Sequence, residues 1–243
     1  MNKILDIEIE FKRINIEKFI NNSINKCQKG YINTINANLL VSAFKNHEYK
    51  QILRKSNLNI CDGSVLASTL NLINQTQYIP YPGPDFFIDK IKEKKYKHTF
   101  LGSTKEVLDN LKIQLTKIDS NIQNAQFIEL PFLKVNEFDY NVIGKMINQT
   151  SSDFIWVSLG APKQEKFSSI LVKHINRGLI VSVGAAFDFH SGLSHVKRSP
   201  KILRNLKLEW LYRVFEQPSK TLKRLKDELI YMPIIIVKEI LKK

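Results

Sequence analysis

Short apolar runs alternate with longer amphipathic stretches over most of the chain. The runs are rich in isoleucine, valine and phenylalanine, which is typical of parallel strands buried on both faces. Strands that alternate with helices at this spacing indicate a mainly parallel sheet with right-handed crossovers, so the pattern predicts an α/β fold. The strands are expected at residues 31–35, 58–61, 98–102, 126–130, 154–158 and 179–183, after a first strand with one solvated face within residues 1–10.

Two consecutive strand–loop–helix units, between residues 154 and 192, carry the most distinctive polar residues. The first turns at Gly160 and continues into Gln164 and Glu165, and the second turns at Gly184 and continues into Asp188. A need for sharp turns explains both glycines, but it explains neither the Gln-Glu pair nor an aspartate between two phenylalanines. Because ligands of open α/β sheets bind at the carboxyl ends of the strands, we predict a functional pocket at this edge.

Polar residues also follow the earlier strands. Thr34 and Asn36 stand at the end of the strand at 31–35, where Asn36 either caps the next helix or contacts a ligand. Asp62 follows the strand at 58–61, and is either a catalytic carboxylate or a turn residue before Gly63. Asp85 follows a rigid turn, where it either caps a helix or faces the site. The strand ends thus supply several candidate groups for one pocket.

The composition points to an anionic partner. The 243 residues fit one large domain, or one domain with an appendage, and the hydrophobic content of 43% is ordinary. The net charge of +14 is not ordinary, and it indicates nucleic acid, a lipid surface or a phosphorylated substrate. Cys27 and Cys61 provide neither a disulfide framework nor metal-ligand spacing, and so fit a reducing compartment.

Several common motifs are absent from the sequence. There is no G-x-G-x-x-G and no Walker A sequence, which disfavours an NAD-type oxidoreductase and a P-loop ATPase. The five histidines form no close ligand pair, so we assign no metal site. No Asp-x-Asp pair is present to hold a divalent ion for a nucleotide sugar. If the protein is a glycosyltransferase, its arginines and lysines after residue 197 are the expected source of charge for the leaving diphosphate.

The chain changes character after about residue 195, which we take as the boundary between an α/β core at 1–195 and a basic helical appendage at 196–243. Leu222, Leu225 and Leu229 fall on one face of a predicted helix, with lysines and an arginine around it, and Pro233 is expected to kink that helix. Such a helix either lies on an anionic membrane surface or packs its leucines on the core. Aliphatic rather than aromatic residues between the cations favour lipid over nucleic acid.

Neither end of the chain resembles a membrane anchor. Residues 1–10 alternate apolar and acidic side chains and lack the uninterrupted apolar stretch of a signal peptide. The longest apolar run, at residues 229–237, is about half of the roughly 20 residues needed to cross a bilayer. We therefore expect a cytoplasmic protein.

Taken together and in order, these motifs resemble the WecG/TagA/CpsF family of bacterial glycosyltransferases from about residue 5 to residue 225. The matching pieces are Thr34-Ile35-Asn36-Ala37, Asp62-Gly63, Gly83-Pro84-Asp85-Phe86, the run from Leu159 to Glu165, the run from Val183 to Phe189, Gly192, Arg198-Ser199-Pro200, and the run from Leu208 to Arg213 with Glu216 and Pro218.

The resemblance implies a Rossmann-like α/β core with a C-terminal appendage that contacts the membrane. It further implies a metal-independent, inverting transfer of an N-acetylhexosamine, usually N-acetylmannosamine or its uronic acid, from a UDP-sugar. The implied acceptor is N-acetylglucosamine on undecaprenyl diphosphate, in the synthesis of teichoic acid or another surface polysaccharide. No further cofactor and no nucleic acid are implied, the expected location is the inner face of the cell membrane, and homo-oligomers occur in the family.

Roles for single residues also follow from the resemblance. Asp62 matches the general base that takes the proton of the acceptor hydroxyl. Arg213 matches an arginine expected to stabilise the leaving diphosphate. Other residues expected to bind substrate are Thr34, Asn36, Asp85, Gln164, Glu165, Asp188, Arg198, Lys220 and Lys223. The two lysines stand where the family often has arginines, and they keep the charge without the bidentate fork.

Overall fold

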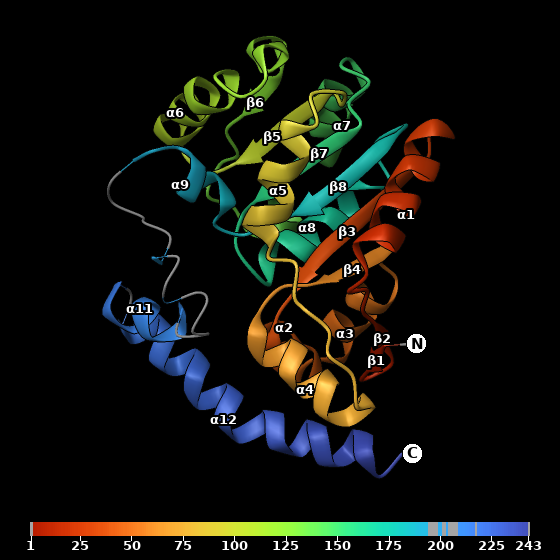
Figure 1. The fold of residues 1–243 in the computed structure, drawn as a ribbon. Coiled ribbons are helices and arrows are strands. Elements are labelled where there is room, and N and C mark those ends of the chain that lie inside the picture. The colour runs from red at the N-terminus through yellow and green to blue at the C-terminus, as the bar shows by residue number, and fades with distance from the viewer. Residues whose placement is uncertain (1, 194–198, 201–202, 204–208, 217, 243) are drawn as a thin grey trace.

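The computed structural model describes residues 2–193, 199–200, 203, 209–216 and 218–242. Its centre is a six-stranded sheet with the order β4-β3-β8-β7-β5-β6, in which every neighbouring pair is parallel (Figure 1). The strands are β3 (Lys29–Ile35), β4 (Leu58–Cys61), β5 (His98–Gly102), β6 (Gln126–Ile128), β7 (Phe154–Ser158) and β8 (Gly178–Ser182). The predicted α/β fold is confirmed.

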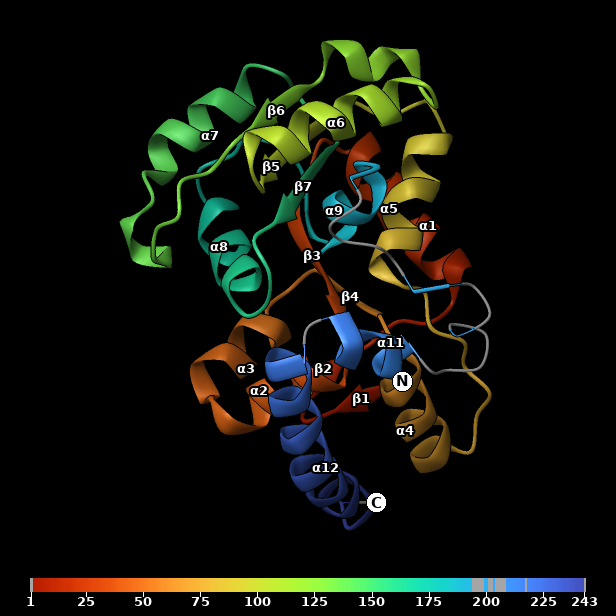
Figure 2. The same ribbon diagram turned by 90° about the vertical axis from the view of Figure 1, so that its left-hand side faces the viewer.

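Helices cover both faces of the sheet (Figures 1 and 2). The helices of the core are α1 (Arg13–Asn25), α2 (Ala37–Lys45), α3 (His47–Arg54), α4 (Ser64–Asn74), α5 (Gly83–Lys92), α6 (Lys105–Thr116), α7 (Tyr140–Asn148), α8 (Lys163–Leu171) and α9 (Ala186–His190), with short 3₁₀ helices η1 (Ser120–Asn124) and η2 (Val135–Glu137). Apolar residues of α1, α5, α6 and α9 pack on one face of the sheet, and those of α7 and α8 pack on the other.

Alternation along the strands explains how both faces become core. In β7, Phe154 and Trp156 point toward α5, whereas Ile155 and Val157 point toward Phe167 of α8. All five residues of this strand are buried. Burial of each large apolar side chain stabilises the fold by about 1.5–3 kcal/mol, so the apolar runs seen in the sequence are the main reason these strands form.

The N-terminal residues differ from the prediction. In place of one strand, β1 (Lys3–Ile4) and β2 (Ile7–Glu8) form a small antiparallel pair outside the main sheet. Leu5 and Asp6 make the turn with positive φ angles. The alternation correctly indicated one buried face, because Ile4 and Ile7 are both fully buried. A tight turn nevertheless lets both isoleucines reach the same core, which a single extended strand of this length would not do.

The C-terminal segment contains α11 (Glu209–Glu216) and the long helix α12 (Pro218–Ile240). Helix α12 packs against α2 and α4, and it continues through Pro233. Met232 and Ile235 are buried on this side, and Lys45 of α2 forms an ion pair with Asp227 at 3.1 Å. No helix in the described part of the chain combines the length and hydropathy needed to cross a membrane.

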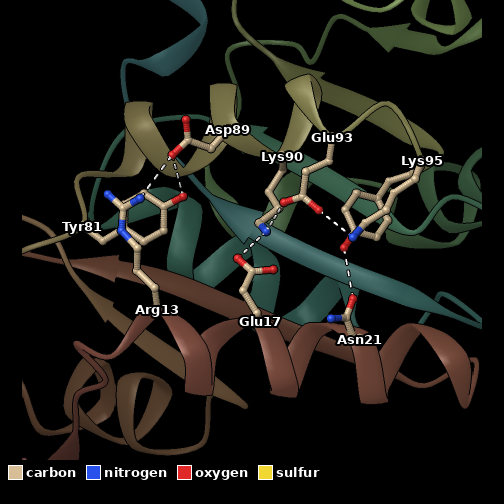
Figure 3. Close-up of polar contacts among 9 residues, drawn as sticks. Arg13, Glu17, Asn21, Tyr81, Asp89, Lys90, Glu93 and Lys95 are labelled. Carbon is tan, nitrogen blue, oxygen red and sulfur yellow. Dashed lines mark hydrogen bonds and ion pairs between the residues drawn. The ribbon is translucent and has the colours of Figure 1, made fainter.

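A cluster of charged residues joins α1 to α5 (Figure 3). Lys90 is only 1% exposed, and its ammonium group pairs with Glu17 of α1 and Glu93. Tyr81 donates a hydrogen bond to Asp89 at 2.8 Å, and the guanidinium of Arg13 lies 4.1 Å from the centre of the Tyr81 ring. A buried ammonium is costly unless it is paired, so these contacts fix how α5 lies on α1.

Candidate active site

The ends of β3 and β4 bring two predicted residues together. Ile35 and Cys61 are register partners, and the backbone N–H of Asp62 donates to the carbonyl of Ile35 at 2.7 Å. Gly63 lies against Asn36, since a Cβ on Gly63 would stand 3.5 Å from the Asn36 Cβ. Asn36 and the partly buried Asp62 therefore lie side by side at the carboxyl edge of the sheet.

Asn36 acts as a helix cap. Its side chain accepts a hydrogen bond from the N–H of Leu39 at 3.2 Å, at the start of α2. This confirms one of the two readings of the sequence, because a cap must satisfy an otherwise unpaired backbone N–H. The cap hydrogen bond holds Asn36 next to Asp62. Contact between Asn36 and substrate stays a prediction.

The thiol next to Asp62 is held in its neutral form. Burial, and secondarily the charge of Asp62, raise the pKa of the Cys61 thiol well above its usual value. The thiol donates weakly to the carbonyl of Gly63 at 3.8 Å. Cys61 therefore stays a neutral thiol at neutral pH, and the role of Asp62 as a general base stays a prediction.

Thr34 links the end of β3 to its neighbours. Its hydroxyl donates to the carbonyl of Ser182 in β8 at 3.0 Å, and the side chain is 5% exposed. Gly83 approaches this threonine so closely that a Cβ on Gly83 would stand 2.9 Å from its hydroxyl oxygen. The start of α5, with the partly buried Asp85 in its first turn, thus lies directly against the strand end.

Gln164 and Glu165 lie in the first turn of α8 but face inward. Gln164 is 3% exposed and Glu165 is fully buried. The Gln164 amide nitrogen donates to Glu165 at 2.8 Å, and the hydroxyl of Tyr49 donates to the other carboxylate oxygen of Glu165 at 3.1 Å. Burial raises the pKa of Glu165, and these two donors counteract part of that rise. The prediction that both residues contact substrate stays untested, but their side chains are engaged within the protein.

Two glycines border open space where β7 and β8 end. Gly160 and Gly184 have φ angles of +72° and +58°, a conformation that favours glycine. Among the described residues, no atom outside the adjoining chain lies within 4 Å of the place where a Cβ would stand at either position. Because β7 and β8 are neighbours in the sheet, these two turns lie next to each other at the carboxyl edge. We call the open space beside Gly160 and Gly184 the open floor of the site.

The remaining predicted residues lie on α9 and in the C-terminal segment, and the structure describes the side chains of only some of them. Asp188 is partly buried in the first turn of α9, and His190 of that helix donates from Nε2 to the carbonyl of Pro84 at 3.1 Å, which ties α9 to the start of α5. Lys223 is exposed on α12. Arg213 and Lys220 belong to α11 and α12, and only their backbone is described. Arg198 lies outside the described residues.

Sequence reasoning missed Tyr49 and Ser158. Tyr49 is a buried residue of α3, and in the sequence it looks like any core residue of an amphipathic helix. Ser158 is the last residue of β7, and its hydroxyl donates to the carbonyl of Gly184 at 2.6 Å. Its position at a strand end was a usable signal for Ser158, whereas nothing in the sequence marked Tyr49.

The arrangement supplies carboxylates, backbone turns and an open floor. Asp62 and Asp188 follow the strands β4 and β8, and Asp85 lies in the first turn of α5, whose start contacts the end of β3. Within the described residues, no group of three or more His, Cys, Asp or Glu side chains is placed to hold a metal ion. A carboxylate at this edge of the sheet can act as a base toward a hydroxyl group bound there.

Comparison with known proteins gives consistent matches. The family model for the glycosyl transferase WecG/TagA/CpsF family matches residues 3–243. A relative from Bacillus subtilis (strain 168), an N-acetylglucosaminyldiphosphoundecaprenol N-acetyl-beta-D-mannosaminyltransferase, is 30% identical over 190 residues, which cover 77% of this chain and 72% of the relative. A protein of the same name from Bacillus spizizenii (strain ATCC 23059 / NRRL B-14472 / W23) is 26% identical over 193 residues, covering 78% and 72%.

Proposed function

The chain belongs to the WecG/TagA/CpsF family of glycosyl transferases, and we propose that it transfers N-acetylmannosamine, or a closely related N-acetylhexosamine, from a UDP-sugar to N-acetylglucosaminyl diphosphate undecaprenol. The names of both relatives support this acceptor and this sugar. The reaction would serve the synthesis of a cell-wall or other surface polymer. The observation that carries the proposal is Asp62, a carboxylate held at the carboxyl end of β4 beside Asn36.

The proposed chemistry is a single displacement with inversion. The acceptor hydroxyl oxygen bonds to the anomeric carbon of the donor while its proton passes to the Asp62 carboxylate. The bond between that carbon and the diphosphate oxygen breaks, and UDP leaves with the electron pair. Asp62 needs no raised pKa for this role, because the hydroxyl becomes acidic only as the new bond forms.

Positive charge from the appendage would stabilise the leaving UDP in place of a metal ion. The net charge of +14 provides ample cations, and Arg198, Arg213, Lys220 and Lys223 belong to this part of the sequence. Helix α11 lies on the side of the molecule toward which the strands point (Figure 1). Electrostatic stabilisation of a developing diphosphate charge is commonly among the largest contributions to catalysis of such transfers.

Helix α12 would bind the protein to the inner face of the cell membrane. Its side opposite α2 and α4 carries large exposed apolar residues: Leu222 (54%), Leu229 (77%), Ile230 (47%), Ile234 (48%), Val237 (55%) and Ile240 (49%). Leu241, directly after the helix, is 80% exposed. Lys223 and Lys226 are exposed on the same helix. An apolar helix face bordered by lysines favours an anionic bilayer surface, where each cation contributes about 1 kcal/mol. This surface would bring the protein to a lipid-linked acceptor.

The test measures UDP release with chelator present, using a panel of UDP-sugars and a synthetic lipid-diphosphate-linked N-acetylglucosamine. We expect acceptor-dependent release with UDP-N-acetylmannosamine. Asp62→Asn should lower turnover by about a hundredfold or more, because general bases contribute about 10²–10⁴-fold, while UDP-sugar binding survives. Asp109→Asn, on the exposed side of α6, is the matched control and should turn over normally. Near-normal turnover of Asp62→Asn would exclude it as the base.

A further inference from the structure

A continuous series of hydrogen bonds connects α3 to the backbone at the end of β8. The Tyr49 hydroxyl donates to Glu165, Gln164 donates to Glu165, and the Gly184 N–H donates to the Gln164 amide oxygen at 3.1 Å. Ser158 completes the series by donating to the Gly184 carbonyl at 2.6 Å. Both polar groups of the Gly184 residue are therefore held by side chains, beside the open floor of the site.

Three members of this series are almost completely buried. Tyr49 is 1% exposed, Gln164 is 3% exposed and Glu165 is fully buried. No basic side chain in the described part of the chain forms an ion pair with Glu165. A buried carboxyl group without a cation is costly unless it is hydrogen-bonded, so Glu165 depends on its side-chain donors Tyr49 and Gln164.

Glu165 also determines which way the Gln164 amide points. Oε1 of Glu165 accepts a hydrogen bond, so the amide nitrogen of Gln164 faces it. The amide oxygen then faces the Gly184 N–H, which needs an acceptor. With the amide reversed, two donors would face each other at Gly184. The orientation of one side chain thus depends on a carboxylate that lies one residue away and is itself fixed by Tyr49.

We propose that Tyr49 and Glu165 are positioning residues, which act through Gln164 to hold the Gly184 turn in the shape that binds the donor sugar nucleotide. Only the identity of the ligand rests on the proposed function. The open space at Gly184 and its neighbour Gly160 is where a bound molecule would meet the backbone. Gln164 and Glu165 then act on the donor indirectly, through the backbone.

The first experiment compares two buried tyrosines. Tyr49→Phe removes the hydroxyl that holds Glu165, and Tyr31→Phe is the matched control, because Tyr31 is also buried and donates to the Ile52 carbonyl of α3 at 2.7 Å. Both variants lose one buried hydrogen bond next to α3, but only the first is connected to Gly184. We expect Tyr49→Phe to raise the KM for the UDP-sugar about tenfold with kcat within about twofold, and Tyr31→Phe to change neither. Equal KM values for the two variants would refute the proposal.

The second experiment measures how firmly the Gly184 turn is held, without using enzyme activity. Glu165→Gln keeps the shape of the side chain but adds donors that compete with Gln164 and Tyr49. Hydrogen–deuterium exchange of a peptide that contains residues 183–187 should accelerate about tenfold or more in Glu165→Gln and in Tyr49→Phe, and stay unchanged in Tyr31→Phe. Unchanged exchange in Glu165→Gln and Tyr49→Phe would refute the positioning role of Tyr49 and Glu165. If exchange accelerates as expected but the wild-type protein uses no UDP-sugar, the proposed function fails while the positioning of the Gly184 turn by these residues stands.

Discussion

At the scale of single residues, position at a strand end predicted which side chains gather but not what each one does. Asp62 and Asn36 lie together because their strands are neighbours in parallel register, which the sequence rule anticipates. Gln164 and Glu165 were also found by position, yet they face inward and are engaged by Tyr49 and Gly184. The sequence could not indicate this, because the direction of a side chain at a helix start depends on the packing of that helix.

Gly184→Ala tests whether the open floor is occupied by substrate. The φ angle of +58° makes alanine strained there, at a cost of about 1–2 kcal/mol in unfolding free energy, but no described atom would meet its methyl group. If the donor lies on this floor, its KM should rise by about tenfold or more, because the methyl group takes space that the ligand needs. Donor KM and urea unfolding measure the two effects separately.

Gly192→Ala provides the control for that substitution. Gly192 has a φ of +78°, and its Cβ would stand 3.2 Å from the end of the flexible Gln114 side chain. The loss of stability should resemble that of Gly184→Ala, since both carry the same kind of backbone strain. A similar KM increase in the two variants would show that strain, rather than occupied space, weakens donor binding.

At the scale of elements, α12 shows what helical periodicity can and cannot predict. The pattern placed Leu222, Leu225 and Leu229 on one face, and left open whether that face meets the core or a lipid surface. In the structure Leu222 and Leu229 are exposed and Leu225 is partly buried, while Met232 and Ile235 pack among residues of α2 and α4. Apolar residues on two sides of one helix give no indication of which side has a neighbour within the chain, so the sequence alone could not decide.

Two adjacent isoleucines separate the roles of these two faces. Ile234 is 48% exposed and Ile235 is fully buried, although they share the same side chain and helix. Ile234→Ser should weaken binding to anionic liposomes by about tenfold or more, since an inserted isoleucine contributes about 1.5–3 kcal/mol, and should leave unfolding nearly unchanged. Ile235→Ser should lower the unfolding free energy by about 2–5 kcal/mol.

Co-sedimentation with liposomes and urea unfolding of both variants make this comparison. At a low temperature, where Ile235→Ser stays folded, we expect this variant to have a lower unfolding free energy than the wild-type protein but to bind liposomes equally well. If Ile234→Ser binds anionic liposomes as tightly as the wild-type protein, the exposed face of α12 is not the membrane contact.

At the scale of the whole molecule, the sequence predicted the strands well and their spatial order not at all. All six strands of the sheet begin within two residues of the predicted positions, and β4, β5 and β7 match at both ends, because buried strands have a distinct composition. The order β4-β3-β8-β7-β5-β6 is not encoded in that composition, since the strands other than β6 are all largely buried on both faces. The N-terminal pair β1 and β2 was missed for a similar reason, as alternation does not show where a short strand turns.

The core also makes stability depend on pH. His98 is buried beside Trp156, whose indole N–H donates to His98 Nδ1 at 3.1 Å. Burial lowers the pKa of His98 from 6.5 to about 4, and the nearby Asp119 opposes this shift. The unfolded chain therefore takes up a proton near pH 6.5 while the folded protein does so only near pH 4. Stability should fall as the pH drops through this range, by about 2 kcal/mol at pH 5 relative to pH 7.

Urea unfolding of the wild-type protein and of His98→Gln at pH 7 and pH 5 tests this expectation. Glutamine keeps an acceptor for the Trp156 N–H and does not titrate. The variant should be less stable at pH 7 but should lose about 2 kcal/mol less than the wild-type protein on acidification. An equal loss in both proteins would assign the pH dependence to other groups.

The central position of β3 and β8 has a consequence for synthesis on the ribosome. β3 ends at Ile35, whereas its partner β8 begins only at Gly178. At about 5–20 residues per second, a nascent chain carries β3 for on the order of ten seconds before that partner exists. During this interval one hydrogen-bonding edge of an apolar strand stays open, and such edges readily pair with other chains. Chaperone engagement of the emerging chain, rather than the stability of the finished fold, should then limit the yield of this protein.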